Sequence, residues 1–277
     1  MHEHSGSRDF LIVGVHFVFA CSISWSLVWG LGVSTADDGW GTLLSNPLLI
    51  LVKFGPTLAG LIVIAIFGPP GGWRLFRDRL FGLGGRLGLF GAVLVAALAT
   101  LPVALGVAVA LDIDVPVPTA TILGAAVSWV ALRTFFGGGL GEEIGWRGVV
   151  LPALLERMGP RNASLVLGVL WTFWHLPVFF GTGGPWWLLM IAQGVLTVSL
   201  SLTFTWIWLR TGGSLPVAIL FHGALNGFNE WAETSWIPAL DDVGEWQVVR
   251  ILLLLVLGIV AAIALPGSGK DPRSGQN

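Results

Sequence analysis

The sequence is poor in charge and in cysteine, and it has no tyrosine. Only 11% of its 277 residues are charged, against about 25% in a soluble domain, so a soluble enzyme with its exterior in water is excluded. The single cysteine, Cys21, excludes an intrachain disulfide and a cysteine-based metal cluster. A net charge of −2 leaves no basic surface for phosphate, so we expect no nucleic-acid partner. Hydrophobic residues make up 55% of the chain and the mean hydropathy is +0.83, which predicts a polytopic membrane protein.

Long apolar runs predict an all-α fold, a polytopic transmembrane helical bundle of about eight spans. A helix needs roughly 20 mostly apolar residues to cross the hydrocarbon core of a bilayer. The runs that qualify are 10–33, 47–67, 87–111, 119–136, 164–180, 186–209, 215–228 and 248–265. The segment 73–83 has apolar residues at helical spacing between arginines, which fits either a helix lying in the membrane interface or an ordinary basic loop.

The connections between these runs alternate in charge. Arginines occupy the connections after the second, fourth and sixth runs, whereas the alternate connections carry aspartate and glutamate. Positive charge favours the cytoplasmic side, so both termini are expected in the cytoplasm. Arginine far outnumbers lysine, and glycine and alanine are abundant, which favours a prokaryotic source and hence its cytoplasmic membrane.

The same features divide the chain into five parts. Residues 1–9 are a cytoplasmic tail, and 10–118 are amino-terminal transmembrane helices with a basic cytoplasmic loop at 68–86. Residues 119–230 form a transmembrane core with the polar motifs described next. An external acidic loop and the last span occupy 231–265, and a disordered tail occupies 266–277.

Glu142, Glu143 and Arg147 form the first polar motif, directly after the fourth run. In a helix, Glu143 and Arg147 are an i,i+4 pair with the acid first, the favourable order. Glu142 points about 100° away from Glu143, which leaves its carboxylate free for chemistry. The alternative is a solvated helix start, where acidic residues favour the helix dipole.

Two further motifs place polar residues inside apolar runs. Trp171 and His175 share a helix face in the fifth run, and Pro177 limits the helix after them. His222 and Asn226 share a face in the seventh run, where Gly223 and Gly227 allow a neighbouring helix to approach closely. Each motif alone fits a packing histidine or a hydrogen bond between helices, but ionisable residues are costly in a membrane and often functional.

Together, these three motifs resemble the CPBP intramembrane protease family, which includes type II CAAX prenyl endopeptidases and Abi bacteriocin-processing or immunity proteins. The resemblance covers about 119–229, and it departs from the family at Trp171, where phenylalanine is usual. It implies a hydrolase that cleaves membrane-embedded or lipidated peptide substrates, with Glu142 activating water, His175 assisting, and His222 and Asn226 stabilising the oxyanion. Glu143, Arg147 and Trp171 would support these residues, and cleavage is expected on the cytoplasmic side.

A metal ion is a second possibility at the same residues. Glu142, His175 and His222 make a His₂Glu donor set that leaves one position open for water, as in a zinc metalloprotease. If Glu142 bound zinc, however, the site would lack a base, since Glu143 is paired with Arg147. No cofactor is therefore favoured.

Two other functions stay open from the sequence. A membrane transporter or channel also places ionisable residues inside spans, but it predicts them spread along a pathway or in broken repeats. A non-catalytic bacteriocin-immunity scaffold would keep the fold without the reaction.

Overall fold

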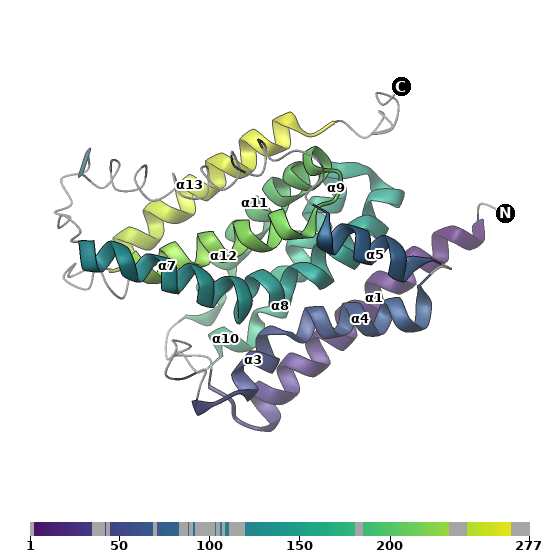
Figure 1. Cartoon of the computed structure of the whole chain (residues 1–277), viewed down its shortest axis with the longest axis horizontal. Helices are drawn as coiled ribbons and strands as arrows, with labels where there is room; N and C mark the ends of the chain where they lie inside the picture. The colour runs from purple at the N-terminus through teal and green to yellow at the C-terminus, as the bar shows by residue number, and fades with distance from the viewer. Residues whose placement is uncertain are drawn as a thin grey trace.

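The computed structural model describes residues 3–34, 45–68, 71–82, 120–180, 185–232 and 243–266, with isolated positions between 42 and 110. Every described element is helical, which confirms the all-α class (Figure 1). The first helices are α1 (Glu3–Trp25), the π-helical turn η1 (Ser26–Gly30), α3 (Leu48–Lys53), α4 (Gly55–Phe67) and α5 (Gly72–Phe81). The others are α7 (Ala120–Phe135), α8 (Gly138–Gly145), the π-helical turn η2 (Trp146–Val150), α9 (Leu151–Trp174), α10 (Leu176–Phe179), α11 (Trp186–Thr211), α12 (Leu215–Trp231) and α13 (Val243–Ala264).

Two of the described helical segments are long and apolar enough to cross a membrane, namely Arg8–Gly30 and Trp186–Thr211. Gly55–Phe67 and Arg250–Ala264 are apolar but shorter. The predicted third span, 87–111, falls almost wholly outside the described residues, as does the tail after residue 266. The number of eight spans therefore stays a prediction.

The exterior of the bundle carries large apolar side chains. They are exposed along the outer faces of α1, α9, α11 and α13, including Phe10, Val18, Phe173, Ile191, Val256 and Ile263. An exposed apolar surface of this extent needs a partner other than water, and a lipid bilayer provides one. Of the two interpretations of 73–83, the structure shows the helix: α5 buries Phe76 and leaves the side chain of Arg77 exposed.

Glycine lets α12 pack closely against α7, as the sequence predicted. A Cβ atom at Gly227 would lie 2.6 Å from the backbone nitrogen of Val130, and one at Gly223 would lie 2.6 Å from Cα of Thr134. Both distances are too short for a side chain, so only glycine permits this approach. The contact fixes the position of α12, which carries His222 and Asn226.

The helix around the second motif is interrupted where the sequence predicted it. The helix α9 ends at Trp174, His175 forms its C-cap, and α10 starts at Leu176 with Pro177 in its first turn. Further back, α9 is kinked at Gly159, whose φ of 72° lies in the left-handed region that favours glycine. Pro160 follows and restarts the helix towards His175.

The position of the first motif in the structure contradicts one of the two interpretations of its sequence. Glu142 is 6% exposed, and Glu143 and Arg147 are fully buried. The helix of the fourth run ends at Phe135, close to the predicted boundary, and after a non-helical Gly137 the chain continues through α8, η2 and the start of α9 inside the bundle. The solvated helix start is wrong, because the motif lies in the interior of the bundle rather than at its edge.

Candidate active site

Glu142 lies on α8 with its two carboxylate oxygens in different surroundings. Oε2 accepts a hydrogen bond of 2.6 Å from the indole N–H of Trp171, on α9. Oε1 lies beside Gly138, where a Cβ atom would be 2.8 Å from Oε1 and 2.7 Å from Cε1 of His222. The absence of a side chain at Gly138 therefore leaves a space that Glu142 and His222 both border.

Glu143 joins two of the predicted site residues. Its Oε1 accepts a hydrogen bond of 2.9 Å from NH1 of Arg147, which confirms the predicted i,i+4 pair, and one of 2.6 Å from Nδ1 of His222. Since a carboxylate only accepts, Nδ1 of His222 carries a hydrogen and Nε2 is left for other partners. Sequence spacing could not reveal the second contact, because the two residues are 79 positions apart.

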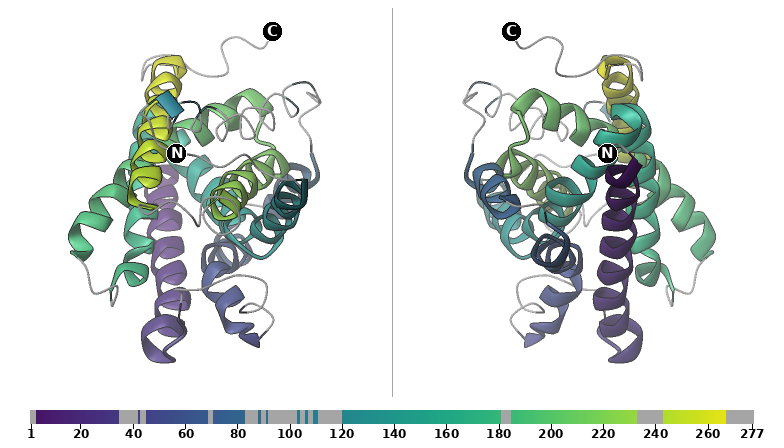
Figure 2. Two further views of the ribbon diagram at one scale, coloured as in Figure 1. Left: turned by 90° about the vertical axis from the view of Figure 1, so that its left-hand side faces the viewer. Right: turned by 90° about the vertical axis from the view of Figure 1, so that its right-hand side faces the viewer.

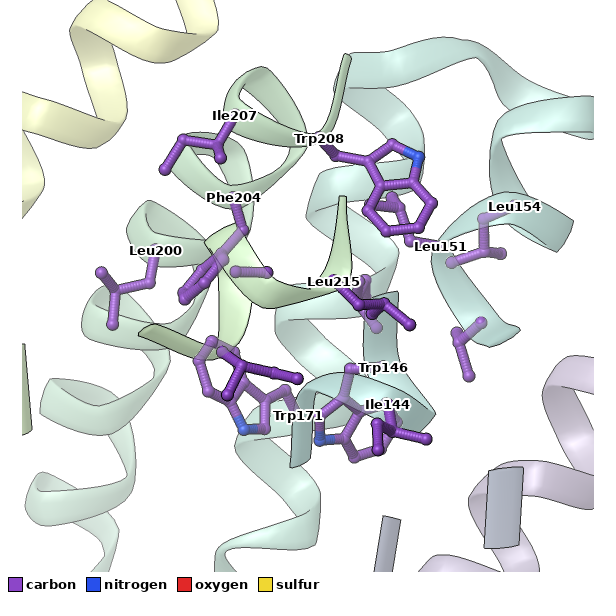
Figure 3. Packing of buried hydrophobic residues seen from close by; sticks show 14 of the residues in the cluster. Ile144, Trp146, Leu151, Leu154, Trp171, Leu200, Phe204, Ile207, Trp208 and Leu215 are labelled. Carbon is purple, nitrogen blue, oxygen red and sulfur yellow. The ribbon is translucent and has the colours of Figure 1, made fainter. Parts of the chain in front are cut away.

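Two aromatic rings hold the Arg147 guanidinium. Its central carbon lies 4.4 Å from the ring centroid of Trp171 and 4.1 Å from that of Phe204, on α11. Figure 3 shows Trp171 and Phe204 within the packed core that surrounds this site. Cation–π contacts of a desolvated arginine are worth about 2 kcal/mol, so the rings stabilise the cation together with Glu143. The indole of Trp171 thus contacts both Glu142 and Arg147.

His175 is fixed at the junction of α9 and α10. Its Nδ1 donates a hydrogen bond of 2.8 Å to the backbone carbonyl of Trp171, and its ring packs edge-on against Trp174 with centroids 4.7 Å apart. In the neutral ring, Nε2 then carries the lone pair that accepts a proton or binds water. The break in the helix at this residue brings the ring to the same cavity as Glu142.

Two cavities meet at these residues. One, of about 230 Å³, is mainly polar, and it is lined by Lys53, Arg133, Gly138, Glu142, His175, Asn226, Asn229, Glu230 and Arg250. The other, of about 190 Å³, is mainly apolar, and it is lined by Ser24, Trp25, Val28, Leu49, Val52, Lys53, Glu142, Trp174, His175, Pro177 and Val178. Glu142, His175 and Lys53 border both. The same carboxylate is therefore bordered by a polar cavity on one side and by an apolar cavity on the other.

The structure brings all four predicted catalytic residues to this place. Glu142, His175 and Asn226 line the polar cavity, and His222 borders the space at Gly138. The side chain of Asn226 makes no hydrogen bond to the described part of the chain, so its amide is available to a ligand. Lys53 and the ion pair of Arg133 with Glu230, 2.8 Å apart, were not predicted. No motif marks them, since they come from α3, α7 and α12.

The three residues of the alternative zinc set do not form a preassembled metal site among the described residues. Among the described residues, no group of three or more histidine, cysteine, aspartate or glutamate side chains is placed to hold a metal ion. Trp171 engages one oxygen of Glu142, and both histidines use Nδ1 within the protein, so the atoms that would hold such an ion are Oε1 of Glu142 and Nε2 of His175 and His222.

Comparisons with known proteins cover this part of the chain. A family model described as type II CAAX prenyl endopeptidase Rce1-like matches residues 124–228. The CAAX prenyl protease 2 of Methanococcus maripaludis is 30% identical over 123 residues, which are 41% of this chain and 45% of that protein. The chain therefore spans about half the length of this curated relative. Glu142, His175, His222 and Asn226 all lie within the residues matched by the family model.

Proposed function

We propose that the protein is an intramembrane endopeptidase that uses a glutamate-activated water, from the premise that residues 124–228 match the type II CAAX prenyl endopeptidase Rce1-like family model, which supports the predicted resemblance to the CPBP/CAAX protease family. Its substrates are membrane-embedded or lipidated proteins, and it acts in a prokaryotic cytoplasmic membrane with both of its termini in the cytoplasm. The observation that carries the proposal is the position of Glu142, which has one oxygen anchored by Trp171 and the other directed to a space shared with His222.

In the proposed reaction, water binds between Oε1 of Glu142 and Nε2 of His175. Glu142 accepts a proton as the water oxygen attacks the scissile carbonyl carbon, and the carbonyl becomes a tetrahedral oxyanion. The proton then passes to the amide nitrogen as the C–N bond breaks, which yields a carboxylate and a free amine. A positioned general base contributes typically 10²–10⁴-fold in rate, and burial from bulk water strengthens each of these interactions.

Asn226 and His222 are proposed to stabilise the oxyanion. The amide of Asn226 is a hydrogen-bond donor that faces the polar cavity, and one such donor is worth about 10²–10³ in rate. His222 donates from Nε2 only in its doubly protonated form, because Glu143 already accepts from Nδ1. Glu143 and Arg147 therefore serve as positioning residues for His222 rather than as a second base.

The two cavities suit a substrate with a lipid or apolar segment beside the bond that is cut. The apolar cavity, between α1, α3, α9 and α10, has room for an apolar side chain or part of a lipid chain. The polar cavity provides hydrogen-bond partners for a peptide backbone. Because both cavities border Glu142, the cleaved bond is expected at the junction between the two segments.

Replacement of Glu142 in the cell tests the proposal directly. In a strain that carries Glu142→Ala, intact substrates are expected to accumulate in the membrane, and a proteome-wide comparison of membrane peptides identifies them. The matched control is Glu156→Ala, which removes a carboxylate of α9 that lines a different cavity. A transporter or an immunity scaffold on the same fold predicts no accumulation of uncleaved peptides, and that result would refute the protease.

A further inference from the structure

The helix α1 lies outside the residues matched by the family model, yet it borders the candidate site. It packs against α3, α4 and α9, and Figure 2 shows α3 and α4 beside the lower part of this long purple helix. Near its C-terminal end, Ser24 and Trp25 line the apolar cavity together with Glu142 and His175. No step of the proposed reaction uses a residue of α1.

Ser24 joins α1 to the junction between α3 and α4. Ser24 is 2% exposed, and its hydroxyl donates a hydrogen bond of 2.7 Å to the backbone carbonyl of Val52. In a continuous helix this carbonyl would accept from the residue four positions later, but that residue is Pro56, which has no N–H. Ser24 therefore supplies the missing donor, directly beside Lys53, which lines both cavities.

The same hydroxyl accepts a hydrogen bond from the end of α9. The indole N–H of Trp174, the last residue of α9, donates to Oγ of Ser24 with a nitrogen-to-oxygen distance of 3.1 Å. The backbone carbonyl of Trp174 accepts a second bond from α1, 3.0 Å long, from the indole N–H of Trp25. The last carbonyls of a helix have no partner within it, so Trp25 satisfies one of them. Trp174 is thus held by α1 through both its ring and its backbone.

Glycine at position 55 allows α1 to approach this closely. A Cβ atom at Gly55 would overlap Oγ of Ser24 and would lie 3.0 Å from the backbone carbonyl oxygen of Ala20. Because Gly55 has no side chain, the hydroxyl of Ser24 can reach Val52 and Trp174 at the same time.

Trp174 in turn limits the orientation of His175. The hydrogen bond from Nδ1 of His175 to the carbonyl of Trp171 fixes one atom of the imidazole. The imidazole also packs edge-on against the indole of Trp174, with ring centroids 4.7 Å apart, and this contact restricts rotation of the imidazole about its fixed atom. The indole therefore determines the direction of Nε2, the atom that binds water in the proposed reaction.

We propose that Ser24 is a positioning residue for the hydrolysis, because its hydroxyl holds the indole of Trp174 against α3 and so fixes the direction of Nε2 of His175 relative to Glu142. This inference rests on the proposed function and adds to it a residue from outside the part of the chain that the family model matches. Ser24 acts through Trp174 and His175 rather than on the substrate.

The NMR signals of the histidines test the positioning step without a substrate. The chain has five histidines, so protein labelled with ¹³C at histidine Cε1 gives few signals, and His175→Gln and His222→Gln identify two of them. In Ser24→Ala, the His175 signal is expected to shift, because the ring current of the Trp174 indole changes when the indole moves. The His222 signal is expected to stay in place.

The matched control is Ser26→Ala, which removes an exposed hydroxyl that donates to the nearby carbonyl of Ile23. It should leave both histidine signals unchanged. An unchanged His175 signal in Ser24→Ala would overturn the inference. Equal shifts of the His175 and His222 signals would also overturn it, since they would indicate a general loosening of the bundle.

Kinetics with a substrate recovered from the Glu142→Ala comparison test the catalytic consequence. Ser24→Ala and Trp174→Phe should each lower kcat about tenfold with little change in KM, since each leaves one partner of a buried hydrogen bond unsatisfied. The double variant should be no slower than the slower single variant, because both changes remove the same hydrogen bond. Ser26→Ala should keep the kcat of the wild type.

Two kinetic results would overturn the inference while leaving the protease intact. One is a kcat of Ser24→Ala equal to that of the wild type, and the other is a loss in the double variant equal to the product of the two single losses. If no peptide accumulates in the Glu142→Ala strain, the proposed function itself is refuted, and the catalytic role of Ser24 is refuted with it.

Discussion

Trp171 differs from the phenylalanine usual in the family by an indole N–H, and that group donates to Glu142 at 2.6 Å. A hydrogen bond to a charged group is worth about 1.5–3 kcal/mol. We expect Trp171→Phe to lower kcat roughly tenfold, about 1.4 kcal/mol, with little change in KM, because the carboxylate loses its orientation while the cavities keep their shape.

The control for this variant is Trp208→Phe. Trp208 is buried in the same apolar core but contacts neither Glu142 nor Arg147, and its ring lies near Arg79 instead. If Trp171→Phe and Trp208→Phe have the same kcat and pH profile as the wild type, the indole N–H has no positioning role.

Arg147 and Glu143 are fully buried, so loss of one partner leaves an uncompensated charge. Removal of one member of a buried ion pair typically costs about 3–5 kcal/mol. Arg147→Ala should therefore lower the Tm in detergent and abolish activity, because Glu143 also fixes His222. Arg147→Lys should restore part of both, since lysine keeps the charge but not the planar group between Trp171 and Phe204.

The matched control is Arg77→Ala, which removes an arginine from an exposed ion pair. A fully active Arg147→Ala would exclude the positioning role of Arg147.

At the scale of helices, the sequence predicted the i,i+4 pair, the break at His175 and the close packing of α12, because each depends on neighbours within one turn or on glycine and proline. It did not predict the contact of Glu143 with His222, the indole bond to Glu142 or the presence of Lys53. Those contacts join helices far apart in the chain, and their geometry is set by packing. The position of Glu142 directly after the fourth run allowed a solvated helix start, but the chain turns at Gly137 and enters the bundle as α8, where Gly138 and Gly139 permit close contact with His222 and Ile219 of α12.

The α7–α12 contact offers a prediction at this scale. A Cβ atom at Gly227 would lie 2.6 Å from the Val130 nitrogen, whereas one at Gly14 on α1 would have nothing within 4 Å. Gly227→Ala should destabilise the protein by about 1–3 kcal/mol and lower activity, because α12 carries His222 and Asn226. Gly14→Ala should be neutral or slightly stabilising. Equal thermal unfolding of the two variants in detergent would mean that the helices can separate without cost.

At the scale of the whole molecule, ionisable side chains lie in the interior of the bundle and large apolar side chains lie on its exterior. Large apolar side chains face outward on α1, α9, α11 and α13, while Glu142, Glu143, Arg147 and His222 are enclosed between helices. This is the reverse of a soluble enzyme, and it is consistent with a membrane-embedded family. The two cavities border Glu142 and His175, so these two side chains face open space within the bundle.

The metal content of the purified protein distinguishes metal-free catalysis by Glu142 from zinc-dependent hydrolysis at the same residues. Both need Glu142, His175 and His222, so alanine variants of these residues cannot separate them. As a zinc ligand, Glu142 needs only a deprotonated oxygen, and the metal activates the water. As a general base, it must accept the proton itself.

We expect less than one zinc per chain, activity that survives a chelator, and no activity in Glu142→Gln. Asn226→Ala should keep about 10⁻²–10⁻³ of the rate, the usual loss for one oxyanion donor, with unchanged metal content. One zinc per chain, lost together with activity on chelation and restored with it, would instead make Glu142, His175 and His222 ligands and require them to move closer together than they lie here.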